Sequence, residues 1–251
     1  MELNLYGKRV LISGSSNGIG KIIAQNFKQE GALVILNGRN SKNLENSANE
    51  LNISNYIQGD VTDPFEAKKI VSECINVFGG IDILICNVGS GKSVPPGLEN
   101  YDEWLKSFRI NFLSATNLVE ASLEHLSKKN GAIVCISSIC GLEVIKDAPI
   151  TYSISKSALN MYVKSIAKPL GEKGIRINAI APGNINFEGS VWHKKVLSDP
   201  NKVKQMLKNE VALNKLGSPE DIAFLATYLS SSISNFITGS IFKVDGGQLK
   251  S

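Results

Sequence analysis

The most constraining feature of this sequence is its alternation of short apolar runs with longer amphipathic stretches. Nearly continuous runs of Val, Ile and Leu are typical of strands that are buried on both faces. Regular strand–helix alternation predicts an α/β fold with an open, doubly wound, seven-stranded parallel sheet, helices on both faces and ligands at the carboxyl ends of the strands. The predicted strands are Arg9 to Ser13, Leu33 to Asn37, Tyr56 to Gln58, Ile81 to Cys86, Ala132 to Ser137, Arg176 to Ile180 and Ile241 to Val244. The predicted helices are 18–30, 41–51, 63–78, 101–128, 151–172 and 218–231.

The chain has 251 residues, which is ample for one large domain with a continuous core. No break in composition, low-complexity linker or fixed repeat divides it, so residues 1–251 are expected to form a single domain. Residues 184–214 interrupt the alternation with a long polar, partly helical stretch. Long excursions beyond the strand ends of such sheets often cover a binding site, so this segment is predicted to be a substrate lid.

Composition argues against several classes of function. The net charge of +4 is spread along the chain, only 4 of the 27 basic residues are Arg, and no basic stripe is interleaved with aromatic residues, so nucleic-acid binding is not expected. The four cysteines lack CxxC spacing and histidine partners, so no metal site is expected. The N-terminus lacks a long apolar run and no apolar segment reaches the length of a membrane span, which favours a cytoplasmic location away from membranes.

The first predicted strand leads directly into a glycine-rich turn, which a helical stretch follows. The turn reads Gly14-Ser15-Ser16-Asn17-Gly18-Ile19-Gly20. Glycines allow a tight turn and a close approach of the backbone to a pyrophosphate, while the start of the helix offers free N–H groups and a positive dipole end. A turn of this kind can be purely structural, but its place between strand and helix predicts a Rossmann-type dinucleotide site. The predicted cofactor contacts here are Gly14, Ser16, Asn17, Gly18, Ile19 and Gly20.

Tyr152 and Lys156 lie four residues apart at the start of a predicted helix, which places both side chains on one face. A phenol with its ordinary pKa of about 10 is a poor acid–base group at neutral pH, and a nearby ammonium can stabilise its phenolate. Surface Tyr/Lys pairs with this spacing are common. The pair gains meaning from the glycine turn and from a serine pair, Ser137 and Ser138, that ends a predicted strand shortly before it.

The combination of a GxxxGxG turn with YxxxK resembles the short-chain dehydrogenase/reductase family, and the likeness runs through nearly the whole chain. Other segments match motifs of that family in the family's order. They are Asp60-Val61, Cys86-Asn87-Val88-Gly89, Asn111, Ile136-Ser137-Ser138, Pro182-Gly183, Thr238-Gly239 and Asp245-Gly246-Gly247.

The resemblance implies an oxidoreductase that moves a hydride between nicotinamide and a carbonyl or secondary alcohol. It implies that Tyr152 is the acid–base group, that Lys156 lowers the pKa of Tyr152 and binds the nicotinamide ribose, and that Ser138 orients the substrate oxygen. Asn111 would hold a water that links Lys156 to solvent. The further cofactor contacts implied are Asp60, Val61, Asn87, Gly89, Pro182, Gly183 and Ile185.

The end of the second predicted strand bears on the choice of cofactor. An acidic residue there would favour NAD(H) by accepting from the ribose 2′-hydroxyl, but this chain has Gly38 followed by Arg39. The forked guanidinium donors of arginine suit the additional phosphate of NADP(H). A second basic residue, frequent in the glycine turn of NADP-preferring relatives, is replaced by Asn17. NADP(H) is therefore the preferred cofactor and NAD(H) a possible one.

Two positions depart from the family pattern. Relatives often carry a threonine four residues beyond Gly183, where this chain has Phe187, so anchoring of the lid to the cofactor is in doubt. Val88 stands where alanine is usual, and its larger side chain is expected to reduce the space beneath the cofactor slightly. Neither change removes a predicted catalytic group.

A serine hydrolase is a competing reading of the active serine. The chain has only two histidines, His125 and His193, and no GxSxG context, which argues against a Ser-His-Asp triad. His193 is more simply a solvated or substrate-contacting residue of the lid.

The substrate is less constrained. Lysines gather in the predicted lid and Lys92 lies near the expected mouth, so an anionic substrate would be attracted, although a solvated lysine-rich helix explains the pattern equally well. The resemblance implies reduction of a 3-oxoacyl thioester, as in 3-oxoacyl-[acyl-carrier-protein] reductases, or of a small ketone, with a sugar or nucleotide sugar as the alternative. A non-catalytic NADP-binding regulatory protein is the alternative from another functional class. The lid lysines are Lys194, Lys195, Lys202, Lys204, Lys208 and Lys215.

The resemblance also implies a homotetramer. The side chains of Leu159, Tyr162, Val163 and Ile166 are compatible with an interface or with internal packing.

Overall fold

Seven strands form one parallel sheet in the computed structural model, which describes residues 2–126 and 131–250. The strand order is β3-β2-β1-β4-β5-β6-β7, which confirms the predicted architecture. Compared with the predicted bounds, β6 runs two residues further, to Pro182, and the Ile81 end of the fourth strand forms only an isolated bridge with Leu126. The strands are β1 (Arg9–Ile12), β2 (Leu33–Gly38), β3 (Tyr56–Gln58), β4 (Ile83–Cys86), β5 (Gly131–Ile136), β6 (Ile175–Pro182) and β7 (Ile241–Val244).

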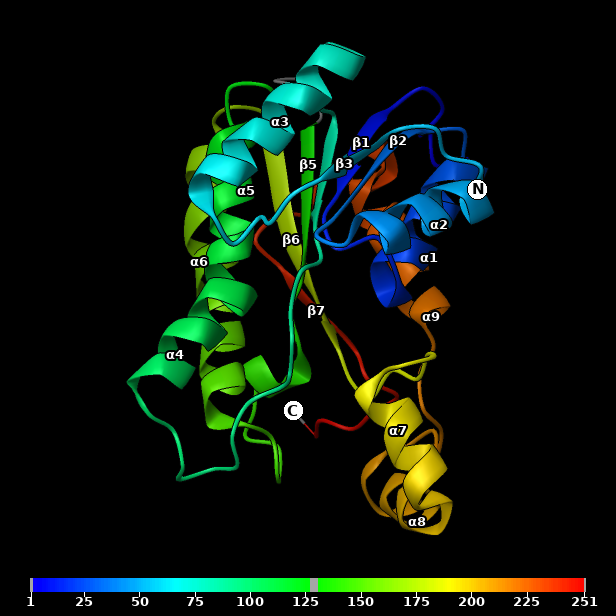
Figure 1. Ribbon diagram of the computed structural model, residues 1–251, viewed down its shortest axis with the longest axis vertical. Coiled ribbons are helices and arrows are strands. Elements are labelled where there is room, and N and C mark those ends of the chain that lie inside the picture. Colours follow the sequence, from blue (N-terminus) through cyan, green and yellow to red (C-terminus); the bar gives the residue numbers. More distant parts are fainter. Residues whose placement is uncertain (1, 127–130, 251) are drawn as a thin grey trace.

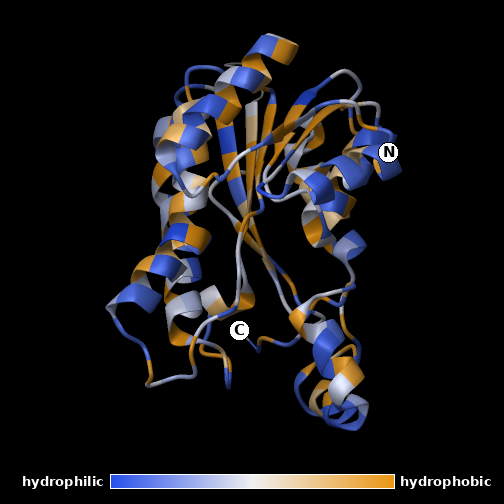
Figure 2. Cartoon of the chain, viewed as in Figure 1, coloured by the Kyte–Doolittle hydropathy of each residue, from blue (hydrophilic) through white to orange (hydrophobic). Residues whose placement is uncertain are grey.

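Helices cover both faces of the sheet (Figure 1). Each face has its own hydrophobic core because successive strand residues point to opposite sides: Leu11 belongs to one core and Ile12 to the other. Figure 2 shows mainly hydrophobic residues along the central strands, whereas the helices carry both hydrophobic and hydrophilic residues. One face carries α3 (Pro64–Phe78), α5 (Ser114–Ser122) and α6 (Ile150–Gly171), and the other α1 (Gly18–Gln29), α2 (Ser41–Leu51) and α9 (Pro219–Ser230).

The order of the strands reverses between β1 and β4. From β1 the chain moves outward through β2 to β3, then returns to pair β4 on the other side of β1 and proceeds to β7. In open parallel sheets the carboxyl ends of the strands at such a reversal form a ligand-binding crevice. The glycine turn follows β1 and residues 87–89 follow β4, so the topology brings both predicted cofactor segments to this crevice.

The helix predicted over 101–128 is shorter and less regular than expected. It consists of α4 (Tyr101–Phe108), a π-helical turn (Arg109–Leu113) and α5, which ends at Ser122. There the carbonyl of Ser122 accepts hydrogen bonds from the N–H groups of His125 and Leu126, which closes a turn and brings Leu126 beside Ile81. The prediction was therefore wrong at its C-terminal end, and positions 127–128 lie outside the described residues.

The 184–214 segment contains α7 (Val191–Ser198) and α8 (Pro200–Glu210), which project beyond the carboxyl ends of the strands (Figure 1). Each helix starts at a capping side chain: Ser190 accepts from the N–H of His193, and Asp199 accepts from the N–H of Lys202. The base of the segment is tied down where Ile185 pairs with Gly217. None of the helices in the described part of the chain combines the length and apolarity that crossing a membrane requires.

Candidate active site

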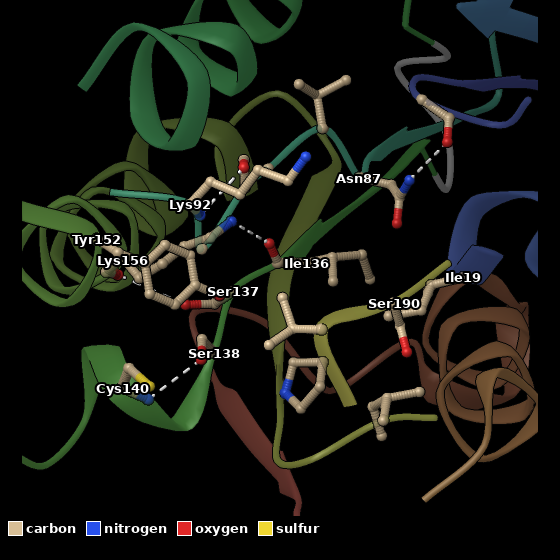
Figure 3. A pocket seen from close by; sticks show the side chains of 18 of the residues that line it. Ile19, Asn87, Lys92, Ile136, Ser137, Ser138, Cys140, Tyr152, Lys156 and Ser190 are labelled. Carbon is tan, nitrogen blue, oxygen red and sulfur yellow. Dashed lines mark hydrogen bonds between the residues drawn. The ribbon is translucent and has the colours of Figure 1, made fainter. Parts of the chain in front are cut away.

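A cavity of about 750 Å³ lies at the carboxyl ends of the strands. It is walled on one side by the glycine turn and on the other by the start of α6, as Figure 3 shows for Ile19 and Tyr152. All but three of the predicted site residues line the cavity. The three that are not part of the lining are Gly18, Gly20 and Asn111. The predicted residues in the lining are Gly14, Ser16, Asn17, Ile19, Arg39, Asp60, Val61, Asn87, Gly89, Ser138, Tyr152, Lys156, Pro182, Gly183 and Ile185.

The glycine turn is held close to the end of β4 by Asn87. The Asn87 side chain donates to the carbonyls of Ser13 (3.1 Å) and Gly14 (3.0 Å). A Cβ atom at Gly20 would lie 2.5 Å from both the Asn87 amide nitrogen and the Gly14 carbonyl oxygen, so only glycine fits there. Gly20 and Asn87 therefore shape the turn that leaves the N–H groups at the start of α1 free to bind an anion.

The opposite end of the cavity carries the predicted cofactor-selecting residues. Arg39 is 70% exposed, and its guanidinium lies 3.5 Å from the carboxylate of Asp60. Partial burial would raise the pKa of Asp60, but hydrogen bonds from Thr62 and the charge of Arg39 outweigh it and lower that pKa. A Cβ atom at Gly38 would lie 3.2 Å from the Ser16 hydroxyl oxygen, so the missing side chain leaves Ser16 and Arg39 facing the cavity.

Tyr152 and Lys156 lie one turn apart on the first part of α6, with Ser138 facing them from the end of β5 (Figure 3). The Lys156 ammonium donates to the carbonyl of Ile136 at 2.7 Å, and the residue is only 2% exposed. Burial lowers the pKa of Lys156 to about 8 and raises the pKa of Tyr152 to about 12, the latter against the effect of a hydrogen bond with Ser138. In the protein without cofactor, burial thus outweighs the hydrogen bond with Ser138 and sets the direction of the Tyr152 pKa shift.

The two serines at the end of β5 have different surroundings. The Ser137 hydroxyl is buried and donates to the backbone carbonyl of Lys156 at 3.5 Å. The Ser138 hydroxyl accepts from the N–H of Cys140 at 3.2 Å, which caps the short 3-10 turn Ile139–Gly141, and it also hydrogen-bonds with Tyr152. Of the pair, Ser138 is the one placed to share a substrate oxygen with Tyr152.

Asn111 lies in the π-helical turn and is 1% exposed. Its amide oxygen accepts from the N–H of Ser90 at 2.8 Å, and its amide nitrogen donates to the carbonyls of Ser90 and Ser107, both at 3.1 Å. A Cβ atom at Gly89 would lie 2.9 Å from the Lys156 nitrogen and 3.2 Å from the Asn111 oxygen. Asn111 thus fixes the loop after β4 and lies next to Lys156 across Gly89. Such π turns occur often at functional sites.

The mouth of the cavity contains Lys195, a lysine of the predicted lid, together with residues that no sequence motif identified. The loop between β5 and α6 contributes Cys140, Ile145, Lys146, Asp147 and Ala148, and α7 contributes Trp192 and Lys195. Their position after a strand's carboxyl end was the only available signal. His193 is outside the lining, as the described residues define it.

Phe187 occupies the position at which relatives often have threonine. A Cβ atom at Gly18 would lie 2.5 Å from its ring, so the ring rests directly on the glycine turn. Gly18 also has a φ of +54°, a left-handed conformation that glycine adopts without strain. The base of the 184–214 segment is therefore packed on the turn by an apolar contact.

Comparisons with known proteins agree with this geometry. A family model described as "Enoyl-(Acyl carrier protein) reductase" matches residues 14–248. The chain is 30% identical to a 3-oxoacyl-[acyl-carrier-protein] reductase of Aquifex aeolicus, over 98% of this chain and 99% of that one. It is also 30% identical to glucose 1-dehydrogenase 2 of Bacillus subtilis, over 98% and 96% of the two chains.

A solved structure with a similar fold is that of L-sorbose reductase from Gluconobacter frateurii complexed with NADPH and L-sorbose. The TM-score is 0.92 at 28% identity, and the similarity covers all of both chains. A fold that agrees over its full length, a matched family model and relatives with dehydrogenase and reductase activities all lead to one assignment. The chain is an oxidoreductase of the short-chain dehydrogenase/reductase family.

Proposed function

We propose that this protein is an NADP(H)-dependent oxidoreductase that transfers a hydride between nicotinamide and a carbonyl or secondary alcohol, with Tyr152 as the acid–base group. The observation that carries the proposal is the meeting of Ser138, Tyr152 and Lys156 on one wall of a cavity whose other wall is the glycine turn. The turn suits a dinucleotide, because Gly20 lets it pack closely against Asn87 and the start of α1 faces the cavity. When bound, the nicotinamide supplies the hydride in reduction or accepts it in oxidation.

The residues of the chain position the substrate and move the proton. Ser138 binds the substrate oxygen and holds it against the Tyr152 hydroxyl, which gives its proton to that oxygen as the carbonyl is reduced. A Tyr152 pKa of about 12 keeps the phenol protonated at neutral pH, the form that reduction requires. Lys156 supplies a buried positive charge that favours the phenolate formed during the reaction, and it binds the ribose. Asn111 connects Lys156 through a water to solvent for reprotonation.

Selection of NADP(H) is proposed to depend on Arg39, Ser16 and the absence of a side chain at Gly38. A phosphate on the ribose would find the exposed guanidinium of Arg39 and the Ser16 hydroxyl without an opposing carboxylate at position 38. The L-sorbose reductase that this chain resembles was solved with NADPH, which supports the same choice.

Replacing Arg39 with alanine is expected to raise the KM for NADPH by about 10- to 100-fold, since a hydrogen bond to a charged group is worth about 1.5–3 kcal/mol. The KM for NADH should change little, because NADH lacks the phosphate, and NADH thus serves as the control within the same protein. Steady-state kinetics with both cofactors measure the effect. A wild-type preference for NADH that Arg39→Ala leaves unchanged would refute the proposed choice.

Phe187 is proposed to hold the base of the lid on the glycine turn and so to slow cofactor release. Phe187→Ala should accelerate NADPH dissociation about tenfold, as expected if partial burial of the ring contributes about 1–2 kcal/mol. Stopped-flow displacement of bound NADPH, followed by its fluorescence, measures the rate. Phe65→Ala is the matched control, because Phe65 is exposed on α3 and lies outside the cavity lining. Equal release rates in the Phe187 variant and the wild type would show that the Phe187 ring does not slow cofactor release.

For the substrate, we propose a 3-oxoacyl thioester or a small ketone, in line with the 3-oxoacyl-[acyl-carrier-protein] reductase among the relatives. A sugar or nucleotide sugar is the second candidate, supported by the similarity to L-sorbose reductase and to glucose 1-dehydrogenase 2. Oxidation of NADPH by the purified protein, measured against acyl thioesters, sugars and small ketones, distinguishes them. A protein that binds NADPH but oxidises it with no member of this panel would instead be a regulatory cofactor-binding protein.

We also propose a homotetramer. The α6 residues Leu159 and Val163 are buried in the protein's own core, and Tyr162 and Ile166 pack against it, so these four residues do not argue for an interface. Two other surfaces carry exposed apolar side chains and are the proposed interfaces. The first lies around α4 and α6, and the second lies near β7, which is an edge strand. The exposed residues are Leu105, Leu113, Ile154 and Met161 on the first surface and Phe224 and Phe236 on the second.

A further inference from the structure

We propose that the substrate carries an anionic group, a carboxylate or a phosphate, that binds between Lys92, Lys146 and Lys195 while its carbonyl faces Tyr152. This rests on the proposed reductase function and narrows its substrate class. These three lysines line the same cavity as Tyr152 and come from three separate segments: the loop after β4, the loop between β5 and α6, and α7.

The lysines belong to the substrate end of the cavity. Gly91, next to Lys92, is close enough to Tyr152 that a Cβ atom on it would lie 4.0 Å from the phenol ring. Lys146 lies three residues before Pro149, which directly precedes α6 and also lines the cavity. The Lys195 ammonium lies 4.4 Å from the centroid of the Trp192 ring, which faces the cavity as well. This cation–π contact holds the charge of Lys195 over the mouth.

Ion pairs among the described residues do not neutralise these three lysines. Within residues 2–126 and 131–250, none of the three lysines has a carboxylate within ion-pair distance. The acidic residues in the lining are Asp147, at the mouth, and Asp60, which is paired with Arg39 at the far end. The three lysines therefore meet only one carboxylate around the mouth of this concave, partly apolar site. A cleft lined in this way has a positive electrostatic potential that attracts anions.

The cofactor phosphates do not account for these lysines. The glycine turn and the start of α1 serve the pyrophosphate, and Arg39 with Ser16 serves the ribose phosphate at the opposite end. The structure also distinguishes Lys195 from the other lysines of the lid segment. Lys194, Lys202, Lys204 and Lys208 are outside the lining, and Lys215 lines a smaller pocket of about 120 Å³.

The test compares charged substrates with neutral ones of the same skeleton. The pairs are acetoacetate with methyl acetoacetate, and dihydroxyacetone phosphate with dihydroxyacetone, which distinguish carboxylate from phosphate. NADPH oxidation gives kcat/KM for the wild type, for the triple variant K92Q/K146Q/K195Q and for the control K194Q/K202Q, whose lysines are outside the lining. Calorimetric titration of the same compounds into the protein–NADP⁺ complex gives affinities whether or not turnover is fast.

The expected result is that one charged compound exceeds its neutral partner at least about tenfold in kcat/KM and in affinity, as one or two charge-assisted contacts provide. The triple variant should lose this preference while the neutral compound keeps its kcat/KM, and the control should retain it. Neutral compounds that bind and react as well as the anions, or a preference that survives in the triple variant, would overturn the inference and leave the reductase function standing. Tight anion binding without any NADPH oxidation would count against the proposed function instead.

Discussion

Replacing Tyr152 with phenylalanine is expected to lower kcat for NADPH-dependent reduction by about 10²- to 10⁴-fold, the usual contribution of a positioned acid. The substitution removes one hydroxyl and keeps the ring, so the wall of the cavity and its packing on α6 are preserved. Ser138 alone would still bind the substrate oxygen, but no group in its place could deliver the proton. NADPH affinity should therefore stay within a fewfold of the wild type.

Tyr162→Phe is the matched control, because Tyr162 lies on the same helix and packs against the core and the ring of Phe112. The control should keep its activity, which separates loss of an acid from disturbance of α6. Steady-state kinetics and NADPH fluorescence titrations of both variants measure the comparison. Substantial activity in Tyr152→Phe would rule out the mechanism proposed here.

Replacing Lys156 with methionine is expected to change activity and stability in opposite directions. The lysine is 2% exposed and burial holds its pKa near 8 instead of 10.5. Because each pKa unit is worth about 1.4 kcal/mol, folding with this charge buried costs on the order of 3 kcal/mol at neutral pH. Methionine removes that cost and gives up one hydrogen bond to the Ile136 carbonyl, worth about 1 kcal/mol, so a net gain of about 2 kcal/mol is expected.

The sign of the pH dependence follows from the lowered pKa. Below pH 8 the lysine is charged in both the folded and the unfolded chain, so the cost is fully present. Between about 8 and 10.5 the unfolded chain holds a proton that the folded protein has lost, so wild-type stability rises with pH. The advantage of Lys156→Met should accordingly be largest below pH 8 and shrink above it.

Activity should fall by a factor on the order of 10² or more in Lys156→Met, since the positive charge beside the reacting groups and the ribose contact are both lost. In the wild type, reduction should slow as pH rises through about 8, where the ammonium loses its proton. Denaturant unfolding without cofactor and NADPH oxidation rates, each as a function of pH, measure the two effects. Lys164→Met on the exposed side of the same helix is the control. A less stable Lys156→Met protein would contradict the burial cost.

Much of the fold was predictable because its signals are local. Strand β5 is apolar throughout, β1 is apolar after Arg9, and the glycine turn stands directly between a strand and a helix. The end of the helix at Ser122 and the π turn around Asn111 were not predictable, since they depend on contacts with Ile81 and Ser90, which are distant in the sequence.

The candidate site divides in the same way. The motifs identified most of the side chains that meet in the cavity, because the strands are parallel and their carboxyl ends therefore share one edge of the sheet. The raised pKa of Tyr152 depends on how deeply its hydroxyl is buried, which no spacing reveals. Lys146 was missed because its loop carries no motif, and it reaches the cavity only through the path of the chain between β5 and α6.

The central claim is that this protein transfers hydride from NADPH to a carbonyl carbon held by Ser138 and Tyr152. Its most direct test is incubation with a ketone panel and NADPH that carries deuterium at the transferable position of the nicotinamide, followed by mass spectrometry and NMR of the products. The proposed function predicts deuterium on the carbinol carbon of at least one product, formed at least about a hundredfold more slowly with Tyr152→Phe. Bound NADPH that gives no deuterium to any member of the panel would contradict it.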